Sequence, residues 1–110
     1  MTSINARFPV KQVVIDENTA ASNVLVALVA DREIRVISLI LTSAAPVVVT
    51  FEQVGGVDLT GPMTLDGAAA APLTAYSETG LFWTAKGVGL NILLGGAVQV
   101  SGVLTYIEVV

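Results

Sequence analysis

The residues that carry most enzymatic chemistry are absent or sparse in this chain of 110 residues. It has no histidine and no cysteine, which removes Ser-His-Asp and Cys-His nucleophile arrangements, disulfides, thiolate ligands and the commonest transition-metal ligand. Carboxylates remain, and a pair of them can catalyse glycoside hydrolysis. The candidates are the neighbours Asp16 and Glu17, the near neighbours Asp31 and Glu33, and the isolated Asp58 and Asp66.

These carboxylates stand among polar, turn-forming residues, where a solvated turn or a hydrogen bond to the local backbone is the ordinary role of an aspartate. Asp58 and Asp66 lie on either side of the sequence LTGPMTL, but the chain has no DxDxDG-type calcium loop. We therefore expect no enzyme activity, no catalytic, cofactor-binding or metal-binding residue, and no cofactor.

The composition argues against nucleic acid as a partner and for a covered surface. The net charge is −4, and the five basic residues are scattered rather than gathered in the patch that a phosphate backbone requires. The apolar fraction is 54%, while the charged fraction is 13%, about half the usual value of about 25%. A domain of this size has a large surface, so such a low charge content suggests that part of that surface does not face water.

The longest uncharged stretch, residues 36–51, is too short for a helical membrane span, which needs about 20 predominantly apolar residues. Pro46 interrupts it, and Arg35 and Glu52 bound it. We expect no contact with a membrane.

The pattern of Val, Ile and Thr, punctuated by Gly, Asp, Asn and Pro, predicts a single all-β domain over residues 11–110, preceded by an N-terminal arm over residues 1–10. We expect an antiparallel β-sandwich of the jelly-roll type with about eight strands, and an immunoglobulin-like sandwich is the alternative. Gly95 and Gly96 are expected to form a two-residue hairpin turn, and Gly102 a bulge or bend. The expected strands are residues 11–15, 22–30, 34–43, 47–54, 63–65, 73–76, 81–85, 88–94 and 97–109, with a further short one possible inside 55–62.

Three of these strands are apolar on both faces. In residues 22–30 and 34–43 both sets of alternating side chains are largely Val, Ile and Leu, and the C-terminal strand repeats this pattern. A strand with two apolar faces implies a sheet that is covered on both sides. Because the chain has no helix to supply the cover, we expect another copy of the chain or a partner to supply it. A monomer with an unusually apolar surface is the alternative.

The expected partner contacts come from these strands, the arm and the aromatic residues. Phe82 and Trp83 should face opposite ways, one in the core and the other available as an anchor at an interface. The arm is either a frayed terminus or a segment that docks on a neighbour. The expected interface residues are Arg7, Phe8, Val24, Val26, Leu28, Val36, Ile40, Trp83, Ile107 and Val109.

Residues 22–110 resemble a group of small proteins encoded in the structural modules of tailed phages. The resemblance is carried by an S-A-x-x-V-x-V-x-F segment at 43–51, Gly61-Pro62, the pair Phe82-Trp83, T-A-x-G-x-x-L-N at 84–91, and V-x-G-x-L-T-Y-x-E-V at 100–109. The first twenty residues show none of it. The resemblance implies a virion structural protein that is made in the bacterial host cytoplasm.

Within that group the chain is most similar to capsid decoration, or cement, proteins. This implies a homotrimer that binds the major capsid protein on the outer surface of the head and stabilises the shell. The alternative is a tail or fibre-tip protein that recognises the host or a glycan. That alternative predicts exposed aromatic residues in the loops at 55–62, 66–72 and 77–80, which contain none.

Overall fold

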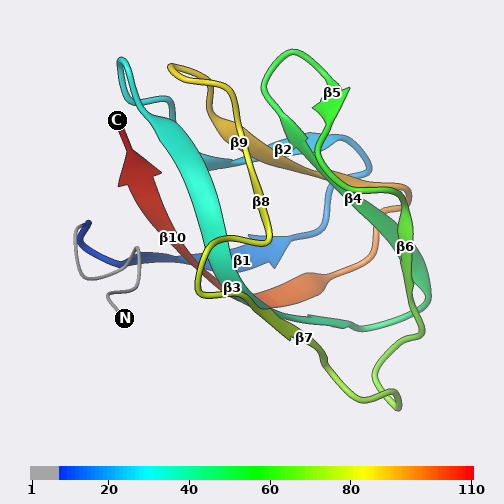
Figure 1. Cartoon of the computed structure of the whole chain (residues 1–110). Coiled ribbons are helices and arrows are strands. Elements are labelled where there is room, and N and C mark those ends of the chain that lie inside the picture. The colour runs from blue at the N-terminus through cyan, green and yellow to red at the C-terminus, as the bar shows by residue number, and fades with distance from the viewer. Residues whose placement is uncertain (1–7) are drawn as a thin grey trace.

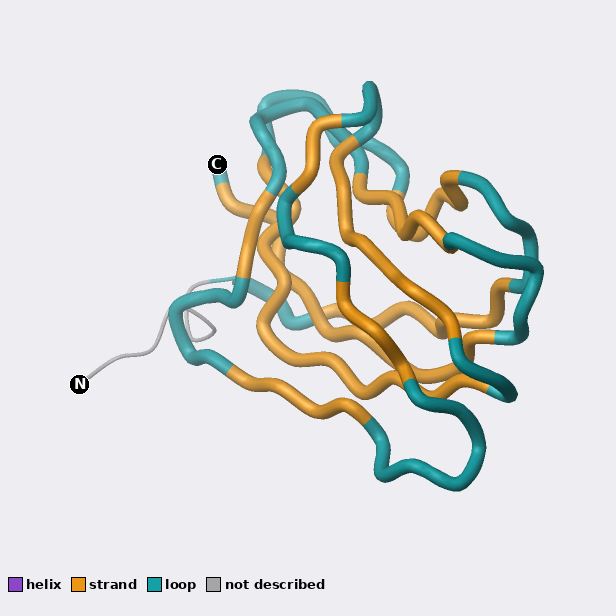
Figure 2. The backbone as a smooth tube through the Cα atoms, turned by 90° about the vertical axis from the view of Figure 1, so that its right-hand side faces the viewer, coloured by secondary structure: helices purple, strands orange, loops and turns teal. Residues whose placement is uncertain are grey.

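The computed structural model describes residues 8–110, and in these residues it contains ten strands and no helix (Figures 1 and 2). The strands form two five-stranded antiparallel sheets that pack face to face, so the predicted all-β sandwich is confirmed. Sheet A contains β1 (Lys11–Glu17), β10 (Val100–Val109), β3 (Glu33–Ser43), β7 (Leu73–Tyr76) and β8 (Phe82–Trp83). Sheet B contains β2 (Ser22–Val26), β9 (Leu90–Leu94), β4 (Val47–Gln53), β5 (Val57–Asp58) and β6 (Met63–Leu65).

The strand pairing is nested. The first strand, β1, pairs with the last, β10, and β2 pairs with β9. Further inward, β3 pairs with β7 and β8, and β4 pairs with β5 and β6. Two further pairings join these pairs into sheets: β10 pairs with β3 in sheet A, and β4 pairs with β9 in sheet B. Segments far apart in the sequence therefore lie side by side, as the blue and red strands do in Figure 1.

The core lies between the inner faces of the two sheets. Leu39 and Leu41 of β3 and Leu104 of β10 meet Val49 and Phe51 of β4 in one cluster of buried side chains. The alternation of apolar and polar residues along β4 produces this arrangement, because successive side chains point to opposite faces.

The aromatic pair Phe82-Trp83 divides between the core and the surface, as expected. Phe82 packs against the core, with its ring centroid 5.0 Å from that of Phe51. Trp83, the next residue, is half exposed.

Three local predictions are wrong. The strand expected over 22–30 ends at Val26, and Leu28 is exposed in the connection that follows. The Gly95-Gly96 pair does not close a hairpin, because β9 and β10 belong to different sheets and the chain crosses between the sheets there. Gly102 stays in register, and the irregularity of β10 falls between Thr105 and Tyr106 instead.

The structure describes only the end of the predicted N-terminal arm. Residues 1–7 lie outside the described residues, while Phe8 is half-buried and Val10 is exposed just before β1. Residues 8–110 contain no helix that could span a membrane.

The segment T-A-x-G-x-x-L-N closes the end of the sandwich after β8. Thr84 is 1% exposed, and its Oγ1 accepts a hydrogen bond from the Ile34 N–H at 3.0 Å and donates one to the Val88 carbonyl at 2.9 Å. Gly87 has a φ of 75°, and its N–H donates to the Arg32 carbonyl at 2.8 Å. The motif therefore has a structural role here, since it fixes the chain that enters β9.

Replacing Thr84 with valine is expected to lower the free energy of unfolding by about 1–3 kcal/mol, because the buried Ile34 N–H loses its acceptor. Urea unfolding followed by Trp83 fluorescence measures the change. The exposed Thr64 of β6 provides the control, and its valine variant should change stability by less than about 0.5 kcal/mol. Equal midpoints for the two variants would contradict this role of Thr84.

Candidate interaction surface

The outer face of sheet A carries exposed apolar side chains in a line across its strands. Val14 of β1 is paired with Val103 of β10, which is paired with Ile40 of β3. Val14 is 70% exposed and Ile40 is 44% exposed, and Val103 between them is half-buried. Their neighbours in sequence that carry side chains pack in the core, so these three point to the outside; the neighbours are Val13, Ile15, Leu39, Leu41 and Leu104. We call Val14, Val103 and Ile40 the apolar row.

The next line of side chains on one side of the apolar row is also uncharged, whereas the line on its other side, Asp16, Ser101 and Thr42, carries the exposed Asp16 carboxylate. Gln12, Thr105, Ser38 and Tyr76 follow one another across β1, β10, β3 and β7. The Ser38 and Thr105 hydroxyls are hydrogen-bonded at 2.5 Å, and Tyr76 is 66% exposed. Beside the apolar row lies a second line that can make hydrogen bonds and one aromatic contact but carries no charge.

Two ion pairs lie together at one end of sheet A. Lys11 Nζ is 3.0 Å from Glu108 Oε1, and Arg35 is 2.7 Å from Glu33 Oε2. The Arg35 guanidinium also stacks on the half-exposed Trp83 ring, 4.7 Å from its centroid. The centre of the face is therefore apolar and its periphery polar, which is the usual anatomy of a protein–protein interface.

The structure places some of the expected interface residues on this face and others elsewhere. Ile40 and Trp83 lie on the outer side of sheet A. Val24 is exposed on the outer side of sheet B, and Leu28 is exposed in the connection after β2. Val109 and Phe8 are half-buried, and Arg7 lies outside the described residues.

Three expected interface residues are buried within the chain itself. Val26 is 6% exposed, and Val36 and Ile107 are 0% exposed. Val26 and Val36 belong to the core cluster between the sheets. These side chains offer no surface to a partner, so their assignment to an interface was wrong.

Val14, Val103 and Tyr76 were not expected at an interface. Val14 lies in the sequence KQVVIDE, where three consecutive apolar residues hide which one faces outward. The pairing of β1 with β10 decides this, since it places Val13 opposite Leu104 and Val14 opposite Val103.

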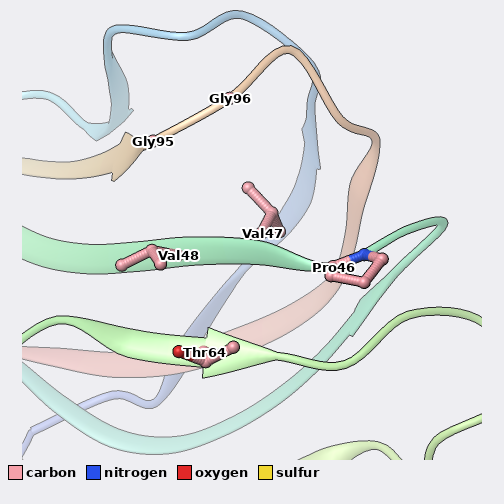
Figure 3. A pocket seen from close by; sticks show the side chains of 6 residues that line it. All are labelled: Pro46, Val47, Val48, Thr64, Gly95 and Gly96. Atoms are coloured by element: carbon pink, nitrogen blue, oxygen red, sulfur yellow. The ribbon is translucent and has the colours of Figure 1, made fainter.

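An open hollow lies beside the start of β4 in sheet B (Figure 3). It has a volume of about 310 Å³ and is lined by Pro46, Val47, Val48, Thr64, Gly95 and Gly96. The lining has one hydroxyl and no charged group. It offers apolar contact and holds no acid, base or nucleophile arrangement.

The carboxylates considered for chemistry are not gathered in one place. Asp16 accepts a hydrogen bond from Gln99 Nε2 at 2.6 Å, and Glu33 is paired with Arg35. Asp31 is exposed in a turn with a φ of 62°, and Asp58 and Asp66 are exposed as well. Within residues 8–110 no three or more His, Cys, Asp or Glu side chains are grouped so that they could hold a metal ion.

Comparisons of the chain with protein-family models, with curated proteins and with solved structures found no match.

Proposed function

We propose that the chain is a non-enzymatic virion structural protein of the tailed-phage type. It acts as a capsid decoration protein, which associates with copies of itself as a homotrimer and binds the major capsid protein on the outer surface of the head. The observation that carries the proposal is the apolar row at the centre of the outer face of sheet A, because a monomer gains nothing from exposing it.

The mechanism follows from this face. Copies of the chain bury the apolar row against one another, and each square ångström of apolar surface removed from water contributes about 25 cal/mol before the cost of association. Tyr76 and Trp83, at the edge of the same face, supply the aromatic contacts that dominate many interfaces. Contacts with the capsid, each weak, then add together over the three copies and over the shell.

The fold agrees with this proposal. The nested pairing of β1 with β10, β2 with β9, β3 with β7, and β4 with β6 is the connectivity of a long hairpin wound over two sheets. That winding supports the jelly-roll subtype, which is common among decoration proteins. The resemblance of residues 22–110 to small phage structural proteins supports the same assignment.

Electron microscopy of virus particles, made with and without this gene, tests where the protein is located. We expect additional density on the outer surface of the head, at three-fold or quasi-three-fold positions, and heads that are less resistant to heat when the gene is deleted. Identical heads in the two preparations would contradict the decoration role.

A host-recognition or glycan-binding module is the second candidate. Tyr76 and Trp83 are both exposed and flank the loop at 77–80, so they offer aromatic surface for a sugar ring. The Arg35 guanidinium covers one side of the Trp83 indole, which argues against a sugar-binding role for this ring. Density at the tail tip instead of the head would favour this candidate.

A further inference from the structure

Glu52 is a buried carboxylate on the side of sheet B that faces away from the core. It is 4% exposed, although its neighbour Phe51 points inward. Its Oε1 accepts a hydrogen bond from the Ser22 hydroxyl of β2, so the side chain reaches across β9 to the next strand. No Lys or Arg side chain of residues 8–110 forms an ion pair with it, because the two ion pairs there join Lys11 to Glu108 and Arg35 to Glu33.

Asn91 lies directly opposite Glu52 in the pairing of β4 with β9. It is 7% exposed, and its Oδ1 has no hydrogen-bond partner among the described residues. A buried acceptor without a partner is uncommon in folded proteins and destabilises them. Because directly opposed residues share a face of the sheet, this oxygen lies on the same side as the Glu52 carboxylate.

A fourth oxygen-bearing side chain lies beside Glu52. Asp58 of β5 is paired with Glu52 on the side away from Asn91 and is exposed. Like charges that face each other across two strands repel. The order across the sheet is therefore the Asn91 amide, the buried Glu52 carboxylate and the exposed Asp58 carboxylate. Figure 1 shows the strands that carry them, β9, β4 and β5.

We infer that Glu52, Asn91 and Ser22 form a binding site for a hard divalent cation, Ca²⁺, on the outer face of sheet B, with Asp58 at its edge. Calcium takes carboxylate, amide and hydroxyl oxygens and completes its shell with water. One ion would supply the missing counter-charge of Glu52, engage the free oxygen of Asn91 and reduce the repulsion between Glu52 and Asp58. The site does not depend on the proposed function.

The donor set explains why the sequence did not reveal this site. Its ligands come from four strands, spaced at 22, 52, 58 and 91, and two of them are a serine and an asparagine. A local calcium-loop pattern therefore cannot detect it. The metal-free alternative is a rotated Asn91 amide that donates from Nδ2 to Glu52, and this alternative predicts no response to calcium.

Thermal unfolding of the full chain in CaCl₂ and in EDTA tests the inference. We expect the wild-type midpoint to rise by about 3–8 °C at a CaCl₂ concentration of about 100 times the dissociation constant. The Glu52→Gln variant keeps the shape of the side chain and removes the charge, so its midpoint should not respond to calcium. The Asn91→Asp variant adds a charge, so it should be less stable than wild type in EDTA and gain more from calcium.

Asp16→Asn is the matched control, since it removes one exposed carboxylate of sheet A and should keep the full calcium response. Isothermal titration with CaCl₂ should give one ion per chain for wild type. Equal midpoints in CaCl₂ and EDTA for both wild type and Asn91→Asp would overturn the site. A calcium response that Glu52→Gln retains would overturn it as well, and Asn91→Asp decides the matter if Glu52→Gln does not fold.

Discussion

Replacing Ile40 with arginine is expected to turn the oligomer into monomers while the chain stays folded. Ile40 lies on the central strand β3 of sheet A, 44% exposed, and is paired with Val103 on one side and Thr74 on the other. An arginine there places a charge within the apolar row, where no charged side chain lies. If that row is buried between copies, the charge must be desolvated without a partner, which costs several kcal/mol.

The measurement is the solution mass by size-exclusion chromatography with light scattering. We expect the variant to elute with the mass of one 11.3 kDa chain at concentrations where wild type has three, which corresponds to a loss of at least about 100-fold in affinity. Because Ile40 is partly exposed, the thermal midpoint of the isolated chain should change little.

Val24→Arg provides the comparison on the other sheet. Val24 is 62% exposed on the outer face of sheet B, so an arginine there is a change of the same kind on a different surface. We expect this variant to retain the wild-type mass. If Val24→Arg dissociates the oligomer and Ile40→Arg does not, the interface lies on sheet B and the assignment to the apolar row is wrong.

Replacing Gly102 with alanine is expected to be the most damaging single substitution to stability. Gly102 of β10 lies between Ile15 of β1 and Leu41 of β3. A Cβ at this position would be 1.8 Å from the Ile40 carbonyl oxygen and 2.8 Å from its carbonyl carbon. These are backbone atoms of a central strand, so the clash is relieved only if β10 and β3 separate.

We expect Gly102→Ala to lower the free energy of unfolding by more than about 4 kcal/mol, a large fraction of the 5–15 kcal/mol that is typical of a domain. Chemical denaturation of the purified variant, or its recovery in insoluble form, reports the effect. Gly61→Ala is the control, because a Cβ there meets nothing within 4 Å. A Gly102→Ala variant as stable as Gly61→Ala would show that β3 and β10 are not paired in this register.

The sandwich and most of its strands were predictable because the strand and turn signals of this chain are local. The chain crossing after Leu94 was not, since Gly95-Gly96 has the composition of a hairpin turn whether the next strand pairs with β9 or joins the other sheet. Only the packing of the two sheets distinguishes these outcomes.

The interface residues were harder to predict, because side chains stop alternating strictly between the two faces of a sheet where the strand pairing has a bulge. Val36 pairs with Tyr106 and Ser38 with Thr105, so Ile37 is an extra residue in β3. One extra residue moves every later side chain to the opposite face. For this reason Val36 lies in the core together with Leu39, although alternation places them on opposite faces.

The same cause acts in β2. Its pairing with β9 shifts between Val24 and Val26, so Val24 is exposed and Val26 is buried, although both have the same parity in the sequence. A bulge depends on the partner strand, which the sequence of one strand does not specify. The Glu52–Asn91 pairing was unpredictable for a related reason, since it joins residues of two distant segments.

The solution mass of the wild-type chain at low and high ionic strength tests the central claim most directly. We predict the mass of three 11.3 kDa chains at both, because an interface centred on Val14, Val103 and Ile40 is apolar and salt does not screen it. A single-chain mass at both ionic strengths, over the concentration range in which a stable trimer would persist, would contradict the proposed self-association.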